Sequence, residues 1–199
     1  MWAYRAREDH LGPEHADTLA TRASHANALR KLQRYAEYES EHRAIAGIAA
    51  RVYGPEHPLT LESRTGRAFA LIRLHRPAEA EEELRAVRDI AAHALGPEHD
   101  VTMTSRHLRA IALHNLGRLT EAEAENRSVL AVWTRDLGPE NAGTLLCRGN
   151  LAAVLRDSGQ AEEAEKEARA VLEIRTRIFG PDHPDTVHIR SLLTQIGKD

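Results

Sequence analysis

The chain has 199 residues, of which 42% are apolar and only 4% aromatic, and its formal net charge is -3 at pH 7. Because acidic and basic residues are interspersed, this charge argues against a nucleic-acid partner and against binding to an anionic membrane. A composition poor in aromatic residues and rich in Ala and Leu favours an all-α fold, since sheets prefer β-branched and aromatic side chains.

Cysteine usage and hydropathy indicate the compartment. The single cysteine, Cys147, cannot form a disulfide within the chain. The first residues, MWAYRAREDH, have neither the apolar stretch nor the small-residue cleavage site of a signal peptide. No segment approaches the roughly 18 consecutive apolar residues of a membrane span. The sequence therefore predicts a soluble protein of the reducing cytoplasm.

A period of 42 residues runs through the chain. It separates the five glycines Gly12, Gly54, Gly96, Gly138 and Gly180. The same interval relates the threonines from Thr18 to Thr186 and the arginines from Arg22 to Arg190. A constant period without insertions is the signature of a repeat architecture, in which each unit stacks on its neighbours.

Each repeat contains two helices, because apolar residues recur at helical spacing on both sides of a short turn, such as DSGQ around Gly159. The first helices of the pairs, helices A, are predicted over 16–32, 58–74, 100–116, 142–157 and 184–196. The second helices, helices B, are predicted over 35–52, 77–94, 119–136 and 161–178. Within these helices, prolines occur only in the first turn, where the missing N–H is tolerated, and no helix interior contains one.

These helices predict one array over residues 1–199. Residues 1–11 are the remnant of a helix B, repeats follow over about 12–53, 54–95, 96–137 and 138–179, and residues 180–199 form a final helix A. Repeat arrays need polar ends to stay soluble. The ends are instead expected to expose apolar side chains and to promote self-association, through Trp2, Tyr4, Leu192 and Ile196.

The segment between repeats has the form Gly-Pro-Glu-His. Gly54 falls just after a helix B, where a glycine in a left-handed conformation closes the helix and Pro55 prevents its continuation. His57 then takes the N-cap of the next helix, as Asn141 does in a later copy, because both side chains can accept a hydrogen bond from a backbone N–H. The motif is interpreted as punctuation between helices.

Geometry excludes a shared metal site for the histidines of this motif. Successive copies are separated by a helix pair, and helices pack about 8 to 10 Å apart. Ligands of one zinc ion lie about 2 Å from the metal, so no single ion can bind His15, His57, His99 and His183. No catalytic or phosphate-binding motif occurs elsewhere, so no catalytic, cofactor-binding or metal-binding residue and no cofactor are predicted.

Two charged series are predicted to stabilise the scaffold. In one, a glutamate precedes an arginine by four residues, the favourable order for a helical ion pair. Its members are Glu39 and Arg43, Glu81 and Arg85, Glu123 and Arg127, and Glu165 and Arg169. The other is the series that begins at Arg22, which is predicted to serve stacking between repeats. Cys147 has no adjacent base and is predicted to be a buried, inert thiol.

The helix pairs resemble the tetratricopeptide repeat. A small residue recurs in helix A at Ala26, Ala68, Ala110 and Ala152, and a Glu-Ala pair recurs in helix B, first at 79–80. The basic unit of that family has about 34 residues. The longer 42-residue period with GPEHPxT between repeats is similar to the kinesin-light-chain subtype. Abundant Arg and Ala with very few lysines indicate a GC-rich bacterial source.

This resemblance implies a right-handed α–α superhelix whose helices A line a concave groove for a partner segment. The positions implied for the groove include Asn27, Arg30, Thr65, Phe69, Arg73, His107, Ile111, His114, Asn115 and Arg156. Phe69 and Ile111 have a second interpretation, as buried packing between helices. The subtype's asparagine pair in helix A is reduced here to Asn150, so its clamp on a peptide backbone is not carried over.

The function that the resemblance implies is a non-catalytic scaffold that binds a protein or peptide partner in this groove. An alternative is a peptide or small-ligand sensor module of a bacterial signalling regulator that has lost or lacks its effector domain. A third interpretation, an enzyme with an unrecognised site, depends on His107, His114 and Asp157, which lie on neighbouring helices.

Overall fold

The computed structural model describes residues 2–197 and the side chains of residues 7–197, and every regular element in that range is an α-helix. The all-α prediction is confirmed, and each predicted helix A or B agrees with the structure to within one residue at either end. The helices are α1 (Trp2–Leu11), α2 (Ala16–Lys31), α3 (Tyr35–Tyr53), α4 (Pro58–Arg73), α5 (Pro77–Ala94), α6 (Asp100–Asn115), α7 (Leu119–Asp136), α8 (Ala142–Asp157), α9 (Ala161–Phe179) and α10 (Pro184–Ile196).

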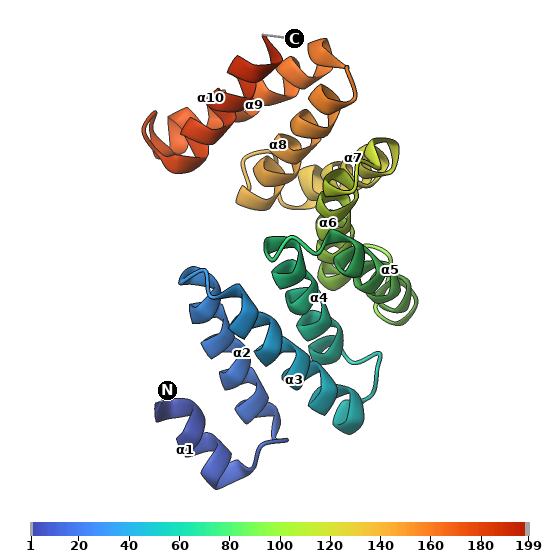
Figure 1. Cartoon of the computed structure of the whole chain (residues 1–199), viewed down its shortest axis with the longest axis vertical. Helices are drawn as coiled ribbons and strands as arrows, with labels where there is room; N and C mark the ends of the chain where they lie inside the picture. The colour runs from blue at the N-terminus through green and yellow to red at the C-terminus, as the bar shows by residue number, and fades with distance from the viewer. Residues whose placement is uncertain (1, 198–199) are drawn as a thin grey trace. The chain divides into compact units, whose positions relative to one another are not determined.

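The helices form two compact units, Met1–Ala112 and Leu113–Asp199, and the boundary between them falls within α6. In the first unit each helix from α1 to α5 packs against the next one along the chain, as Figure 1 shows for α2, α3 and α4. In the second unit α7, α8, α9 and α10 pack in the same sequential way. Packing between sequence neighbours is the pattern expected of stacked helix pairs.

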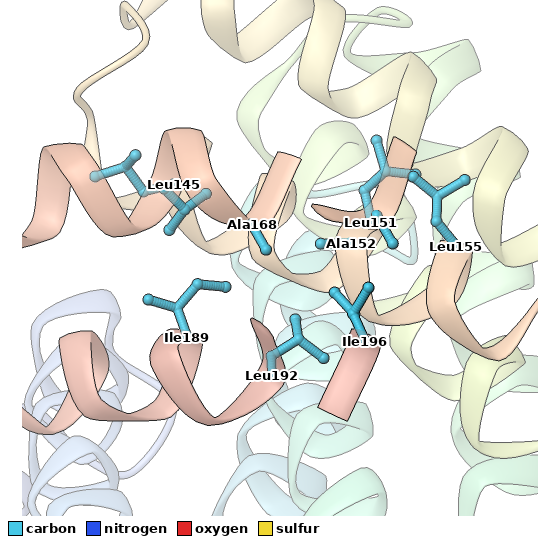
Figure 2. Close-up of a cluster of buried hydrophobic side chains, with 10 residues drawn as sticks. Leu145, Leu151, Ala152, Leu155, Ala168, Ile189, Leu192 and Ile196 are labelled. Carbon is cyan, nitrogen blue, oxygen red and sulfur yellow. The ribbon is translucent and has the colours of Figure 1, made fainter. Parts of the chain in front are cut away.

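The core of the second unit joins three helices. Leu145, Leu151 and Leu155 of α8 pack with Ala168 of α9 in one buried cluster. Figure 2 shows three side chains of α10 directed into this cluster, those of Ile189, Leu192 and Ile196. The last helix is therefore an integral part of the core.

This packing corrects the prediction that the array ends expose apolar side chains. Leu192 and Ile196 are only 6% and 5% exposed, because they face α8 and α9. Trp2 and Tyr4 lie outside the described side chains. On α10, the large apolar side chain that is exposed is that of Val187. Its equivalent in the second repeat, Leu61, is buried against Val87 and Ala91 of the following helix α5, and no helix follows α10 among the described residues.

The capping prediction for the segment between repeats is confirmed. The Nδ1 atom of His57 accepts a hydrogen bond from the backbone N–H of Leu59, at 3.2 Å. Asn141 caps α8 in the same way, through Oδ1 at 2.8 Å from the backbone nitrogen of Gly143. Corresponding bonds are made by the other three histidines of the series, His15, His99 and His183. Each cap satisfies one of the N–H groups that a helix N-terminus leaves without a partner.

Two of the glycines before the caps depart from the predicted left-handed helical conformation. Gly54 has φ 99° and ψ 163°, and Gly180 has φ 86° and ψ 167°. The positive φ was expected, but the extended ψ places both residues in a region that is essentially restricted to glycine. The chain therefore leaves helix B in an extended direction, and the requirement for glycine is stricter than a left-handed helical turn would impose.

The turns inside the repeats do not all use glycine. Gly117 and Gly159 have φ 74° and 75°. The equivalent residues of the first two repeats are Gln33 and His75, with φ 57° and 59°. A side chain in this region costs about 1 kcal/mol, so these two turns are held by the packing of the helices that they join.

The arginine series that begins at Arg22 joins the two helices of one repeat, which corrects the predicted role in stacking between repeats. Arg22 of α2 bonds Glu41 of α3 at 3.0 Å, and Arg64 of α4 bonds Glu83 of α5 at 2.8 Å. The Nε atom of Arg148 of α8 lies 2.8 Å from a carboxylate oxygen of Glu167 of α9, which is the equivalent pair in the fourth repeat. The sequence pattern did not indicate these ion pairs, because each glutamate lies 19 residues after its arginine, on the other helix of the pair.

The predicted helical ion pairs are present at Glu39, Glu123 and Glu165, which bond the arginine four residues later at 2.7, 2.9 and 2.5 Å. Glu39 also bonds Arg67 of the next helix A at 2.9 Å, and Glu81 bonds its equivalent Arg109 at 2.8 Å. In the first unit, ion pairs of this glutamate series therefore join one repeat to the next, beside the apolar contacts between repeats.

The histidine caps can be tested at His57. The variant His57→Ala should lower the free energy of unfolding by about 1 kcal/mol, because the N–H of Leu59 loses its acceptor. His57→Asn should keep the cap and lose only the ring contact with Tyr53, whose centroid lies 4.9 Å away. Urea unfolding followed by circular dichroism measures both changes. Equal stability of His57→Ala and the unaltered chain would contradict a capping role.

A matched pair of glycines tests the conformation after helix B. Gly54→Ala should destabilise the protein by about 1 to 3 kcal/mol, because alanine is strained at this φ and ψ. Gly47→Ala, inside α3 and with open space around the added methyl group, should stabilise it by about 0.5 to 1 kcal/mol. Opposite shifts of the urea midpoint are expected. Shifts of the same sign would show that the backbone at Gly54 relaxes freely.

Candidate partner-binding surface

Five of the residues predicted for the groove lie in the first unit on α2 and α4, and three of them join one cluster. Phe69 contacts the rings of Tyr35 and Tyr38 edge to face, with centroids 6.2 and 6.1 Å apart. The guanidinium carbon of Arg30 lies 5.7 Å from the Phe69 ring centre, and that of Arg73 lies 5.1 Å from the Tyr35 ring centre. We call Arg30, Tyr35, Tyr38, Phe69 and Arg73 the arginine–aromatic cluster.

The members of the arginine–aromatic cluster differ in their exposure. Tyr38 is buried, and Phe69 is half-buried where it packs against two apolar clusters of the core. Arg30 and Arg73 are exposed. Cation–π contacts of this kind orient a guanidinium group without neutralising it. The cluster therefore presents two fixed positive charges on an aromatic base, and Phe69 serves packing as well as this surface.

The remaining groove positions of the first unit are divided between surface and core. Asn27 is exposed, and Ile111 is half-buried against the same apolar cluster as Phe69, in agreement with its packing interpretation. Thr65 and His107 are only 6% and 4% exposed, so this structure does not present them to a partner. These two occupy the same position in successive repeats, which shows that this register points into the helix packing and not onto the exposed face.

In the second unit, three groove positions lie near the ends of α6 and α8. The Nε2 atom of His114 lies 2.7 Å from one carboxylate oxygen of Asp157, and Arg156 binds the other oxygen at 2.6 Å. Arg156 also donates to the side-chain oxygen of Gln195. Asn115 is exposed beside His114. We call His114, Arg156, Asp157 and Gln195 the His–Asp network.

The His–Asp network keeps Asp157 ionised. Burial would raise the pKa of Asp157, but the hydrogen bonds from His114 and Arg156 outweigh it and lower the pKa below its ordinary value. The pairing of His114 with Asp157 matches part of the enzyme interpretation. The third residue of that interpretation, His107, is buried in the other unit, and the second contact of the carboxylate is Arg156, which is not a nucleophile.

Neither a metal site nor a reactive thiol accompanies these surfaces in the part of the chain that the structure describes. No three His, Cys, Asp or Glu side chains are arranged there to hold a metal ion. Cys147 is buried as predicted, and burial raises the pKa of its thiol to about 12, so it stays protonated. Between residues 2 and 197, no helix has the length and apolar character required to cross a membrane.

One feature of the first unit was not predicted, the contact between His42 of α3 and Gly66 of α4. A methyl group added to Gly66 would lie 2.8 Å from the His42 ring. The ring is buried, packs edge to face on Tyr38, and has no hydrogen-bond partner at either nitrogen. Burial lowers the pKa of His42 to about 4, although nearby Glu41 opposes the shift. His42 is therefore neutral near pH 7.

The repeat period identifies this contact as one position that varies along the chain. The residues equivalent to His42 and Gly66 are Leu84 and Leu108, then Asn126 and Asn150, then Ala168 and Leu192. A comparison of these two positions among the four repeats would have indicated the contact between His42 and Gly66, because only the first repeat combines an aromatic ring with a glycine there. Asn150, the residue retained at the subtype's asparagine position, has a buried amide nitrogen without a partner, as has Asn126.

Comparisons with known proteins agree with this architecture. Models of the tetratricopeptide repeat family match residues 64–131 and 144–185. The chain is similar to a crystal structure of kinesin light chain nearly identical TPR-like repeats from Podosopora anserina, with 25% identity and a TM-score of 0.75 over 92% of this chain and 87% of that one. A search of the curated proteins found no match.

A second solved structure supports the fold alone. BtubC (BKLC) from P. vanneervenii is 18% identical and superposes with a TM-score of 0.78 over 98% of this chain and 78% of that one. Both similar structures superpose on nearly the whole chain and the repeat models match two parts of it, so the prediction of a tetratricopeptide repeat solenoid of the kinesin-light-chain type is confirmed.

The buried histidines predict a loss of stability in acid. Because the pKa of folded His42 is about 4 and that of an exposed histidine is 6.5, the unfolded chain binds more protons between these values. The free energy of unfolding is therefore expected to fall as the pH decreases from 6.5 toward 4, by about 2 kcal/mol per histidine at about pH 5. Urea unfolding at about pH 7.5 and 5 measures this change. His107, with a pKa of about 4, contributes in the same window.

A substitution taken from the next repeat isolates the contribution of His42. His42→Leu, which introduces the residue found at Leu84, should roughly halve the loss of stability between the two pH values. His93→Leu, at an exposed position of α5, is the control and should leave the loss unchanged. An undiminished loss in His42→Leu would show that the folded state accommodates the charged imidazole of His42.

Proposed function

Because the chain belongs to the tetratricopeptide repeat family, we propose that it acts as a non-catalytic interaction module that binds a segment of a partner protein. Repeats of this family commonly mediate protein–protein interaction and are typically not catalytic. The part of the surface that we assign to the partner is the arginine–aromatic cluster of the first unit. The His–Asp network of the second unit is proposed as a separate contact.

The observation that carries this proposal is the placement of Arg30 and Arg73 over aromatic rings. Both arginines are exposed, yet each is oriented by a ring at 5.7 or 5.1 Å. Arginine and aromatic side chains are enriched among the residues that dominate binding energy at protein interfaces. Because these guanidinium groups are already positioned, a partner carboxylate would bind them with a smaller loss of side-chain entropy.

The base of the arginine–aromatic cluster supports a specific surface. Phe69 joins two apolar clusters of the core, and Tyr38 is buried beside it. The backbone positions that carry the two arginines are therefore held by packed helices, which keeps the spacing between the charges constant. A partner segment that combines acidic residues with an apolar side chain fits this combination of charge and aromatic surface.

The His–Asp network offers a different chemistry. His114, Arg156 and Asp157 are partly exposed and already linked to one another, so they supply both donors and an acceptor to a partner. His114 and Arg156 occupy the repeat position of Arg30, and Asp157 occupies that of Arg73, so the two surfaces use the same positions of different repeats with different side chains. The sequence similarity to kinesin-light-chain TPR-like repeats supports an interaction role for both.

The proposal is tested by changing only the exposed charges of the cluster. The double variant Arg30→Glu and Arg73→Glu leaves Phe69 and its packing intact, so the helical content should not change. Protein captured from a lysate of the source organism is then compared by quantitative mass spectrometry. A partner held by the unaltered chain should be reduced at least about tenfold in the variant, because a hot-spot residue contributes about 2 kcal/mol or more.

A control with the same change in charge accompanies this experiment. Arg85→Glu and Arg135→Glu alter two exposed arginines on α5 and α7, outside both proposed surfaces. The control should capture the partner as well as the unaltered chain does. Equal loss in both double variants would indicate a general effect of charge, and equal capture by all three proteins would place the interaction elsewhere.

A further inference from the structure

A second site of different chemistry lies in the first unit, away from the arginine–aromatic cluster. It is an open cavity of about 360 Å³ between α3, α4 and Glu83 of α5. The residues that line it are Arg43, Ala46, Gly47, Ala50, Pro55, Thr60, Arg64, Arg67 and Glu83. None of them belongs to the surfaces proposed above, so a ligand here would be an addition to the proposed function.

The two sides of this cavity differ in polarity. Ala46, Gly47 and Ala50 of α3 give an apolar side made of small residues. The polar side of the cavity carries three arginines, Arg43, Arg64 and Arg67. A ligand that fills the cavity must therefore combine a short apolar stem with a group that accepts hydrogen bonds from guanidinium N–H groups.

The arginines of the cavity are only partly neutralised. Glu39 bonds both Arg43 and Arg67, at 2.7 and 2.9 Å, and Glu83 bonds Arg64 at 2.8 Å. Two carboxylates thus face three guanidinium groups, which leaves one positive charge in excess. The Nη1 atom of Arg67 is 3.8 Å from Glu83, too far for a hydrogen bond. Each guanidinium has five N–H donors, so donors remain for a further acceptor.

The cavity exists because the first repeat departs from the others at two adjacent positions. Where this repeat has Ala46 and Gly47, the later repeats have Arg88 and Asp89, Leu130 and Ala131, and Leu172 and Glu173. Side chains therefore occupy this register elsewhere, and in two of the three cases the residue in the place of Gly47 is acidic. The arginine at the position of Arg43 is present in all four repeats.

We propose that this cavity binds the side chain of a glutamate in a partner peptide. The methylene groups of the glutamate would lie along Ala46, Gly47 and Ala50, and its carboxylate would take the excess charge of Arg64 and Arg67. A phosphate group lacks the apolar stem that the small residues of α3 select.

The direct test is a titration of the full-length, nitrogen-15-labelled chain, followed by NMR. The probe is the capped peptide acetyl-Ala-Ala-Glu-Ala-Ala-amide, and the comparison peptide carries Gln in place of Glu. We expect the Glu peptide to shift the amide signals of residues 43–50 and 60–67 and to bind at least about tenfold more tightly than the Gln peptide, a difference of about 1.4 kcal/mol. Equal binding of the two peptides would overturn the proposal.

Two variants with the same chemical change locate the site. Gly47→Glu fills the cavity with a carboxylate from the chain itself, and open space around Gly47 lets the variant fold. Ala131→Glu makes the equivalent change in the second unit. The proposal requires that Gly47→Glu abolish the signal shifts caused by the Glu peptide and that Ala131→Glu preserve them. Shifts that persist in Gly47→Glu would place the peptide elsewhere and overturn the assignment.

Two further probes identify the source of the carboxylate. Glutarate has a similar stem and a carboxylate but no peptide groups, and inorganic phosphate has neither stem nor carboxylate. A peptide site should bind both more weakly than it binds the Glu peptide. Tighter binding of glutarate would assign the cavity to a free dicarboxylate, and tighter binding of phosphate would assign it to a phosphate group; either result would overturn the peptide proposal.

Discussion

The structure depends on the turn between repeats. A glycine at positive φ ends each helix B that precedes the motif, and a histidine or asparagine caps the following helix A through one hydrogen bond. At Thr60 and Thr102 the threonine of the repeat adds a bond from its hydroxyl to the carbonyl of that glycine, at 2.9 and 2.8 Å. Because these groups recur every 42 residues, each helix A begins at the same register, and its apolar face meets the neighbouring helices without adjustment.

Two kinds of ion pair accompany this packing. The pairs of the Arg22 series join the helices within a repeat, and in the first unit Glu39 and Glu81 join one repeat to the next. Glu39 is buried, and its pairing keeps the pKa of this carboxyl below the ordinary value despite burial. Buried charges of this kind specify which helices meet more than they add to stability. They also leave arginines in fixed positions at the edges of the helices.

The proposed binding surfaces lie where the repeats stop being identical. The repeat position of Phe69 holds Ile111 and Ala153 in later repeats, and around Phe69 two tyrosine rings and two arginines gather. The cavity beside Gly47 likewise follows from two small residues that other repeats replace. A repeated scaffold tolerates such differences because the caps and glycines already determine the helix positions. Recognition can therefore vary from repeat to repeat while the fold stays constant.

The sequence by itself determined the helices, their caps and the family, because these depend on local chemistry that recurs at a constant interval. It could not determine which long side chains meet, since Arg22 and Glu41 lie 19 residues apart and Glu39 and Arg67 lie 28 apart. Of the groove positions, Arg30, Phe69 and Arg73 lie in the arginine–aromatic cluster, and His114 and Arg156 lie in the His–Asp network. Thr65 and His107 are buried. Whether a position on a helix faces solvent or a neighbour depends on how closely helices approach, as at Gly66 and His42, and only the tertiary structure decides that distance.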